Sequence, residues 1–188
     1  MKRRTVLAGT GSGLSSLVVG CLQETNDTEP DESSTETYEL VQFSAPTGTS
    51  DWAGHEERSG YLEFYGSTDV AFANLDFNYV EEERRDAVES FVEETEFDDE
   101  ALLYIASRGP DTSYTEIAVE ELETDAGVII GTARAKRPQN GGGGGGSAVT
   151  YPSALVRIIG PMEAPERAEI TVVDGWGEKT ELVAEMQR

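Results

Sequence analysis

The only thiol of the chain belongs to Cys21, and the residues before it predict its chemistry. Arg3 and Arg4 stand side by side, and a weakly apolar stretch rich in glycine and serine follows over residues 5–20. Paired arginines before such a stretch are typical of a twin-arginine export signal. The stretch is shorter than the roughly 20 strongly apolar residues of a spanning helix. It ends in Val-Val-Gly-Cys, which resembles a lipobox, in which the thiol is the nucleophile that takes the lipid.

Cleavage before Cys21 would make this residue the new, lipid-modified N-terminus. We therefore expect residues 1–20 to be a signal peptide and Cys21 to anchor the protein in the cell membrane, facing the extracellular side. Two lipid chains would make such an anchor stable, whereas one chain alone holds only marginally. Export in the folded state requires no disulfide, and the chain has no second cysteine to form one. The alternative is a buried N-terminal helix with an incidental cysteine.

Catalytic chemistry has few candidate residues. His55 is the only histidine, and a serine or cysteine nucleophile needs such a base. The serines near it, Ser50 and Ser59, lie in the same polar loop, which lacks the features of a nucleophile elbow. Glycosidase chemistry needs only two carboxylates at a defined separation, and a chain with 37 acidic residues neither supports nor excludes it. We expect a protein without catalytic residues.

Metal and phosphate chemistry also lack a matching pattern. Acidic clusters at residues 81–83, 93–94 and 98–100 could offer oxygen ligands, but none has the spacing of an EF-hand loop. Zinc would need three or four His or Cys ligands. The glycines at 141–146 are followed by an expected strand rather than by the helix start of a phosphate loop. We interpret the clusters as a solvated surface and the glycines as a flexible hairpin tip, and expect no metal and no cofactor.

The charge balance is strongly acidic. The chain has 14 basic and 37 acidic residues and a net charge of −23, and Lys136 and Lys179 are its only lysines after residue 20. Such a chain repels itself in dilute buffer, but in molar salt the Debye length falls to about 3 Å. The composition is typical of an extreme halophile; the alternative is a protein built to bind cations or a basic partner. A nucleic-acid partner is not expected, because a polyanion would be repelled.

The chain divides into a leader, a stalk and one domain. Residues 21–37 comprise Cys21 and a segment rich in acidic residues, serine and threonine, without an apolar period. This composition is typical of a disordered stalk. Asn26 begins an Asn-Asp-Thr sequon, a candidate glycosylation site. Residues 38–188 are long enough for a single domain with its own core.

The domain reads mainly as β-strands. A helix is expected over 80–94, where apolar residues recur at helical spacing and Asn78 is a candidate cap. Pro152 should break the strand that contains it or place it at a sheet edge. Strands are expected at 38–44, 61–65, 70–77, 101–107 (central), 114–123, 127–136, 147–159, 168–174 and 178–185. The predicted fold class is mainly β, an antiparallel sandwich or small barrel with one packed helix, with α+β as the alternative.

Two tryptophans stand outside the expected strands. Trp52 lies in the polar loop 45–59, and Trp176 lies in a turn between two glycines. An exposed tryptophan in a loop can stack on a sugar or anchor a partner protein. The alternative is that each ring folds back as a lid over the core.

The segment 101–158 combines three features: an apolar strand at 102–105, Tyr114 with Ile117 after a Gly/Pro turn, and Tyr-Pro followed by Leu-Val-Arg over 151–157. In these features it resembles the C-terminal domain of PrcB-type proteins. This chain has Thr-Ser before Tyr114, where paired glycines are usual. A similar Gly-Tyr turn occurs in chagasin-like protease inhibitors. The resemblance implies a non-enzymatic accessory subunit of a surface protease complex.

These observations favour a lipid-anchored, outward-facing binding or accessory module. Its expected contacts are the loop 108–114, which holds Arg108 and Tyr114, the glycine run, the Trp176 turn and Trp52, provided that the loops cluster at one end of the sandwich. A second hypothesis is a regulator of a cell-surface protease. A third is an enzyme that uses carboxylates or His55, and a fourth is a solute-capture protein, for which the domain is small.

Overall fold

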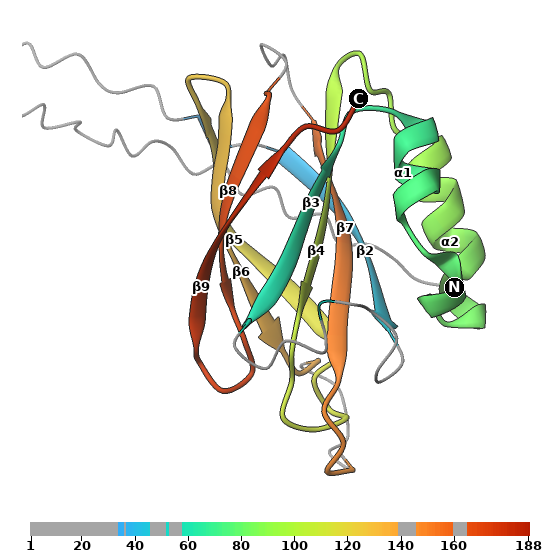
Figure 1. Cartoon of the computed structure of the whole chain (residues 1–188), viewed down its shortest axis with the longest axis vertical. Coiled ribbons are helices and arrows are strands. Elements are labelled where there is room, and N and C mark those ends of the chain that lie inside the picture. The colour runs from blue at the N-terminus through green and yellow to red at the C-terminus, as the bar shows by residue number, and fades with distance from the viewer. Residues whose placement is uncertain (1–33, 36, 46–51, 53–57, 139–145, 160–164) are drawn as a thin grey trace, which may run out of the picture. The chain divides into compact units, whose positions relative to one another are not determined.

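The computed structural model describes residues 34–35, 37–45, 52, 58–138, 146–159 and 165–188. The compact unit to which they belong extends from Glu32 to Arg188. It contains a first short strand, β1 (Ser34–Thr35), inside the range that the sequence assigns to the stalk. Two β-sheets face each other in this unit and do not close into a barrel, so the fold is mainly β and a sandwich (Figure 1).

One sheet of the sandwich has four strands in the order β2-β7-β4-β3, and all neighbours are antiparallel. The strands are β2 (Thr37–Ala45), β3 (Gly60–Tyr65), β4 (Glu100–Ser107) and β7 (Tyr151–Ile159). The prediction that 101–107 is a central strand is confirmed. Pro152 lies on an inner strand, not at an edge. It is tolerated there because it is the second residue of β7, one step beyond Ser153, the last residue paired with β4.

The other sheet has the order β1-β5-β6-β8-β9. Its longer strands are β5 (Glu116–Asp125), β6 (Val128–Lys136), β8 (Arg167–Val173) and β9 (Lys179–Glu185). The pair β6–β8 is parallel, an exception within a sandwich whose other named strand pairs are antiparallel as expected. The reason is the route of the chain: after β6 it crosses to the facing sheet as β7, then returns to run beside β6 in the same direction.

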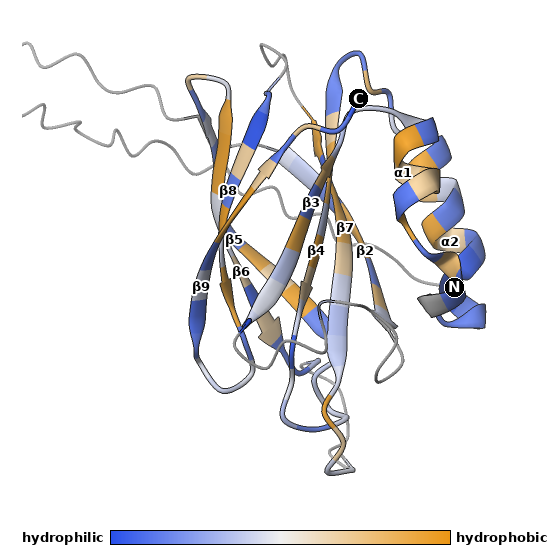
Figure 2. Ribbon diagram, viewed as in Figure 1, coloured by the Kyte–Doolittle hydropathy of each residue, from blue (hydrophilic) through white to orange (hydrophobic). Residues whose placement is uncertain are grey.

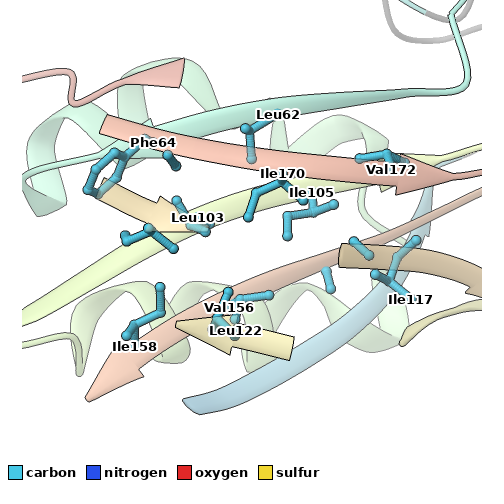
Figure 3. Close-up of a cluster of buried hydrophobic side chains, with 14 of the residues drawn as sticks. Leu62, Phe64, Leu103, Ile105, Ile117, Leu122, Val156, Ile158, Ile170 and Val172 are labelled. Carbon is cyan, nitrogen blue, oxygen red and sulfur yellow. The ribbon is translucent and has the colours of Figure 1, made fainter. Parts of the chain in front are cut away.

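Alternating side chains of both sheets fill the sandwich core (Figure 3). Each strand turns every second residue inward, as the period of two requires. The inward side chains include Leu62, Phe64, Leu103, Ile105, Ile117, Leu122, Val156, Ile158, Ile170 and Val172. Burying one such side chain stabilises the fold by about 1.5–3 kcal/mol.

Residues 68–74 form a helix, α1 (Thr68–Asn74), so the strand expected at 70–77 is wrong. Ser67 caps this helix, since its hydroxyl oxygen accepts a hydrogen bond from the Val70 N–H at 3.3 Å. Ala71 and Leu75 are both buried, and residues four apart share one helix face. A 3₁₀ turn, η2 (Phe77–Tyr79), follows, and its cap is the Asp76 side chain.

The expected helix at 80–94 is present as α2 (Glu82–Glu93). Asn78 is not its cap: it lies inside η2, and the N-terminal residue Glu81 makes no side-chain capping bond. In Figure 2 the hydrophobic colour follows the central strands, whereas much of α2 is blue. Among the described residues, no helix is long and apolar enough to span a membrane.

The two helices cover part of the outer face of the β2-β7-β4-β3 sheet. A second apolar layer therefore lies outside the sandwich core. Its buried members are Phe43, Tyr65, Leu102 and Leu155 from the strands and Ala71, Leu75, Val80, Val88 and Val92 from the helical segment. This sheet is thus buried on both faces, which explains why β4 and β7 are almost continuously apolar.

A glutamine joins the two sheets at the seam between β2 and β5. The Gln42 amide donates to the Ile117 carbonyl at 2.7 Å and accepts from the Ile117 N–H at 2.9 Å. Beside it, the Tyr38 hydroxyl donates to the Val119 carbonyl at 3.0 Å. One side chain therefore satisfies both backbone groups of an edge residue, as a neighbouring strand would.

Replacing Gln42 with alanine should lower the free energy of unfolding by about 2 kcal/mol, because two hydrogen bonds are lost and two backbone groups are left unpaired. Gln42→Glu should cost less, since a carboxylate still accepts from the Ile117 N–H. Denaturant unfolding in molar salt measures both, with Thr37→Ala on the exposed part of β2 as the control. An alanine variant as stable as the control would show that the bridge adds nothing.

Candidate functional site

Three segments that are distant in sequence meet at one end of the sandwich. They are residues 108–115 between β4 and β5, residues 146–150 before β7, and the β8–β9 turn, 174–178; together we call them the loop end (Figure 1, lower end). Gly175 N–H donates to the Arg108 carbonyl at 2.8 Å. Thr112 N–H donates to the Gly146 carbonyl at 3.1 Å. The expected clustering is therefore present for Arg108, Tyr114, Trp176 and Gly146, the one glycine of the run that the structure describes.

A buried carboxylate fixes the β8–β9 turn. The side chain of Asp174 has no exposed surface. Its Oδ1 accepts from the backbone N–H groups of Trp176 and Glu178 at 2.9 and 3.0 Å. Its Oδ2 accepts from Arg108 Nη2 at 3.1 Å. Because charged hydrogen bonds are about twice as strong as neutral ones, this arrangement holds the turn in one conformation against β4.

Trp176 is the exposed group that this turn presents. Its surface is 52% exposed, whereas most large apolar side chains of the described residues are covered. The guanidinium of Arg108 lies over the indole, 5.6 Å from the ring centre. Such a cation–π contact contributes about 0.5–1 kcal/mol at an exposed site. The ring is therefore held in place without being buried, which suits a contact surface.

Tyr114 is the internal pin of the loop end. An added Cβ at Gly175 would lie 2.4 Å from Pro110 Cδ and 2.9 Å from Tyr114 Cε1. An added Cβ at Gly109 would lie 2.3 Å from Tyr114 Cβ. Glycine is required at both positions because the two segments pack directly on this tyrosine. Tyr114 is half-buried between these segments and positions them relative to each other.

A second arginine covers Tyr114 from the other side. The guanidinium of Arg137 lies 4.8 Å from the Tyr114 ring centre and pairs with Asp111 at 2.8 Å. Asp111 also accepts hydrogen bonds from the hydroxyl and, at 2.9 Å, from the backbone N–H of Ser113. These hydrogen bonds, together with the charge of Arg137, lower the pKa of the Asp111 carboxyl below its ordinary value. The carboxylate therefore stays ionised over the physiological range.

Trp52 is not part of the exposed surface, so its expected role as a contact residue is wrong. It is only 5% exposed and packs on the outer face of the four-stranded sheet. Its ring stacks on Tyr61 with centres 6.0 Å apart and meets Tyr151 edge-on at 5.4 Å. The alternative reading, a lid over the core, is the one that the structure supports.

A carboxylate between two phenols is the polar cluster that sequence reasoning missed. Tyr61 donates to Glu63 Oε1 at 2.6 Å, and Tyr65 donates to Glu63 Oε2. The alternation Tyr-Glu-Tyr at 61, 63 and 65 was a usable signal, because these side chains share one face of β3. Burial raises the pKa of Tyr65, and the charge of Glu63 raises it further. Burial likewise raises the pKa of Tyr61.

The neighbouring Tyr104 completes this cluster. Its hydroxyl lies 3.5 Å from Ser153 Oγ, and burial raises its pKa to about 12. All three phenols therefore remain protonated at neutral pH and serve as hydrogen-bond donors. A proton donor or acceptor for catalysis near pH 7 would need a pKa near that value. The arrangement fits a structural network under the Trp52 lid.

The remaining surface offers an open, acidic hollow. It has a volume of about 420 Å³ and lies between the start of α1 and the segment after α2, lined by Ser67, Thr68, Thr95, Glu96, Phe97, Asp98 and Asp99. Within the described part of the chain, no group of three or more His, Cys, Asp or Glu residues could hold a metal ion.

Several predicted residues lie outside the described residues: Arg3, Arg4, Cys21, Asn26 and His55. Comparisons with protein-family models, with curated proteins and with solved structures give no significant match. The loop end is therefore the candidate functional site of the described residues.

Proposed function

We propose that this protein is a membrane-anchored, extracytoplasmic lipoprotein of a halophile that acts as a non-catalytic binding or accessory module. The export signal at Arg3 and Arg4 and the lipobox at Cys21 supply the address and the anchor. The acidic segment after Cys21 holds the domain away from the membrane, and Asn26 in that segment is available for glycosylation.

The observation that carries the proposal is the rigid presentation of Trp176. A turn locked by a buried Asp174–Arg108 pair holds an indole that is 52% exposed. A protein that only needed a stable turn would gain nothing from an exposed indole there. Tryptophan and arginine are enriched among residues that dominate binding energy, and pre-organised groups lose little entropy on binding. The loop end therefore fits a binding surface better than a simple connection.

Trp176→Ala should abolish recovery of a partner while leaving the domain folded. The experiment is co-purification from membranes of the source cell, kept in molar salt after mild cross-linking, with mass spectrometry of the captured chains. Loss of a central anchor of about 2 kcal/mol lowers affinity about 30-fold. Because the ring is about half exposed, the free energy of unfolding should fall by no more than about 1 kcal/mol, the contribution of the cation–π contact with Arg108.

Val183→Ala is the matched control. Val183 is the other large hydrophobic side chain that the described residues expose, at 54%, and it lies on β9 away from the turn. The control should retain the partner that Trp176→Ala loses. Equal recovery with both variants, or recovery of no stoichiometric chain with the unmodified protein, would contradict the proposal.

The alternative function is regulation of a cell-surface protease, as subunit or inhibitor. It is supported by the resemblance of residues 101–158 to PrcB-type domains. One residue of that resemblance, Tyr114, is the residue of this chain on which Gly109 and Gly175 of the loop end pack. Adding the purified protein to membranes should then change the rate of peptide hydrolysis. If a bound partner is recovered but the rate of peptide hydrolysis does not change, the protein is an accessory module and not a protease regulator.

A further inference from the structure

The tip of the β8–β9 turn projects from the domain. Gly175 packs against Pro110 and Tyr114, but a Cβ built at Gly177 would meet no atom within 4 Å. Gly177 has φ +88°, which favours glycine and lets the chain reverse directly after the exposed indole. Trp176 therefore stands on a convex knob, with its base fixed and its tip free.

Basic residues gather around this knob in an otherwise acidic chain. Lys136 ends β6 and Lys179 begins β9, so both lysines that follow residue 20 lie at the loop end, with Arg108 and Arg137. Arg58 joins them, because the N–H of the next residue, Ser59, donates to Thr180 Oγ1 at 3.3 Å. The acidic clusters at 81–83 and 98–100 belong instead to the helical segment and its flanks.

Two of these cations have no carboxylate partner among the residues that the structure describes. Arg137 pairs with Asp111 and Lys136 with Glu116 at 3.5 Å. Neither Lys179 nor Arg58 forms an ion pair with any residue that the structure describes, and both are exposed. In a chain with 37 acidic and 14 basic residues, a lysine that forms no ion pair with the described residues and follows an exposed tryptophan by three positions is a charge available to another molecule.

We propose that the knob docks into an apolar pocket with an acidic rim on a folded partner protein. This inference rests on the proposed function and names its partner class. Trp176 would fill the pocket, and Lys179 and Arg58 would meet carboxylates at the rim. A folded protein is the favoured occupant because a pocket with carboxylates at its rim matches both the exposed indole and the nearby cations, whereas a neutral sugar ring would match the indole alone. Electrostatic complementarity at the rim then sets specificity.

Site-directed photo-crosslinking in intact cells tests the docking geometry. Photoreactive benzoylphenylalanine replaces Glu178, two residues after Trp176, or, as the control, Glu181, another exposed glutamate, which lies on β9. We expect one partner polypeptide to be captured from position 178 and not from 181. In the captured partner, the cross-linked peptide should lie within an acidic surface.

Charge variants of Lys179 test the rim. Lys179→Glu should reduce the yield from position 178 about tenfold, because like charges would face each other, and Lys179→Arg should restore it. Circular dichroism confirms that each variant folds. Three results would overturn the inference. They are a cross-linking yield that does not change with the charge of residue 179, an equal yield from positions 178 and 181, and an adduct whose added mass is that of a sugar or a lipid.

The two proposals fail in different ways. If co-purification recovers a partner but position 178 captures nothing, the binding module stands and the knob is not its docking element. If no partner is recovered by either method, the proposed function itself is wrong.

Discussion

Replacing Arg108 with alanine should destabilise the protein by about 3 kcal/mol, a large effect for a residue in a loop. The Asp174 carboxylate has no exposed surface, and among the described residues Arg108 is its one side-chain partner, at 3.1 Å. Removing the cation leaves a buried negative charge whose remaining donors, in the part of the chain that the structure describes, are the backbone N–H groups of Trp176 and Glu178. Breaking one half of a buried pair is costly because the remaining charge is uncompensated.

Arg137→Ala is the control for this prediction. Arg137 also lies over an aromatic ring and pairs with an aspartate, but its side chain is 57% exposed. Exposed ion pairs contribute about 0–1 kcal/mol, so this variant should remain close to the unmodified protein. Denaturant unfolding in molar salt compares the two. The double variant Arg108→Ala with Asp174→Asn should recover part of the lost free energy of unfolding. If it does not, Arg108 stabilises the protein by a contact other than the ion pair with Asp174.

Raising the pH above about 10 should progressively destabilise the domain, because buried phenols resist ionisation in the folded state. The pKa of Tyr65 is raised by burial and by Glu63, and that of Tyr104 is raised to about 12. In the unfolded chain both ionise near pH 10. The folded state then binds more protons than the unfolded state, so the free energy of unfolding falls as pH rises. Tyr65 alone contributes a slope of about 1.4 kcal/mol per pH unit above pH 10.

Two measurements check the alkaline transition. Phenolate absorbance should rise together with loss of the native circular dichroism signal rather than ahead of it. Tyr65→Phe should reduce the pH dependence of stability above pH 10. Tyr38→Phe, at the seam between β2 and β5, is the comparison. If the absorbance of the native protein reached its final value near pH 10, the phenols of the Glu63 cluster would not be protected.

Local patterns in the sequence were enough for most strands. The segment 101–107 is apolar on both faces, and it lies inside a sheet covered on both sides. The turn at Asp125 to Gly127 was predictable from its glycine, and Ala126 and Gly127 both have positive φ, as a tight hairpin requires. The strand predicted at 70–77 was wrong because Val-Ala-Phe-Ala is compatible with both a strand and a helix. The N-terminal cap formed by Ser67 favours the helix.

The candidate site was predictable only in part. Trp176 and Arg108 were named because a tryptophan between glycines and an arginine in a turn stand out locally. The exposure of Trp52 was wrongly predicted because its burial depends on contacts with Tyr61 and Tyr151, which lie on the strands β3 and β7. Asp174 was missed because one buried carboxylate among 37 acidic residues has no local signature.

The crossing of the chain from β6 through β7 to β8 has a consequence for how the domain assembles. The parallel β6–β8 pair joins two strands that are separated in the chain by β7, which lies between β2 and β4 in the facing sheet. Neither half of the sandwich can therefore be completed on its own. Folding must wait for contacts between distant segments, which is slow, and no fragment containing a single sheet should persist. The domain should accordingly lose its structure in one cooperative step.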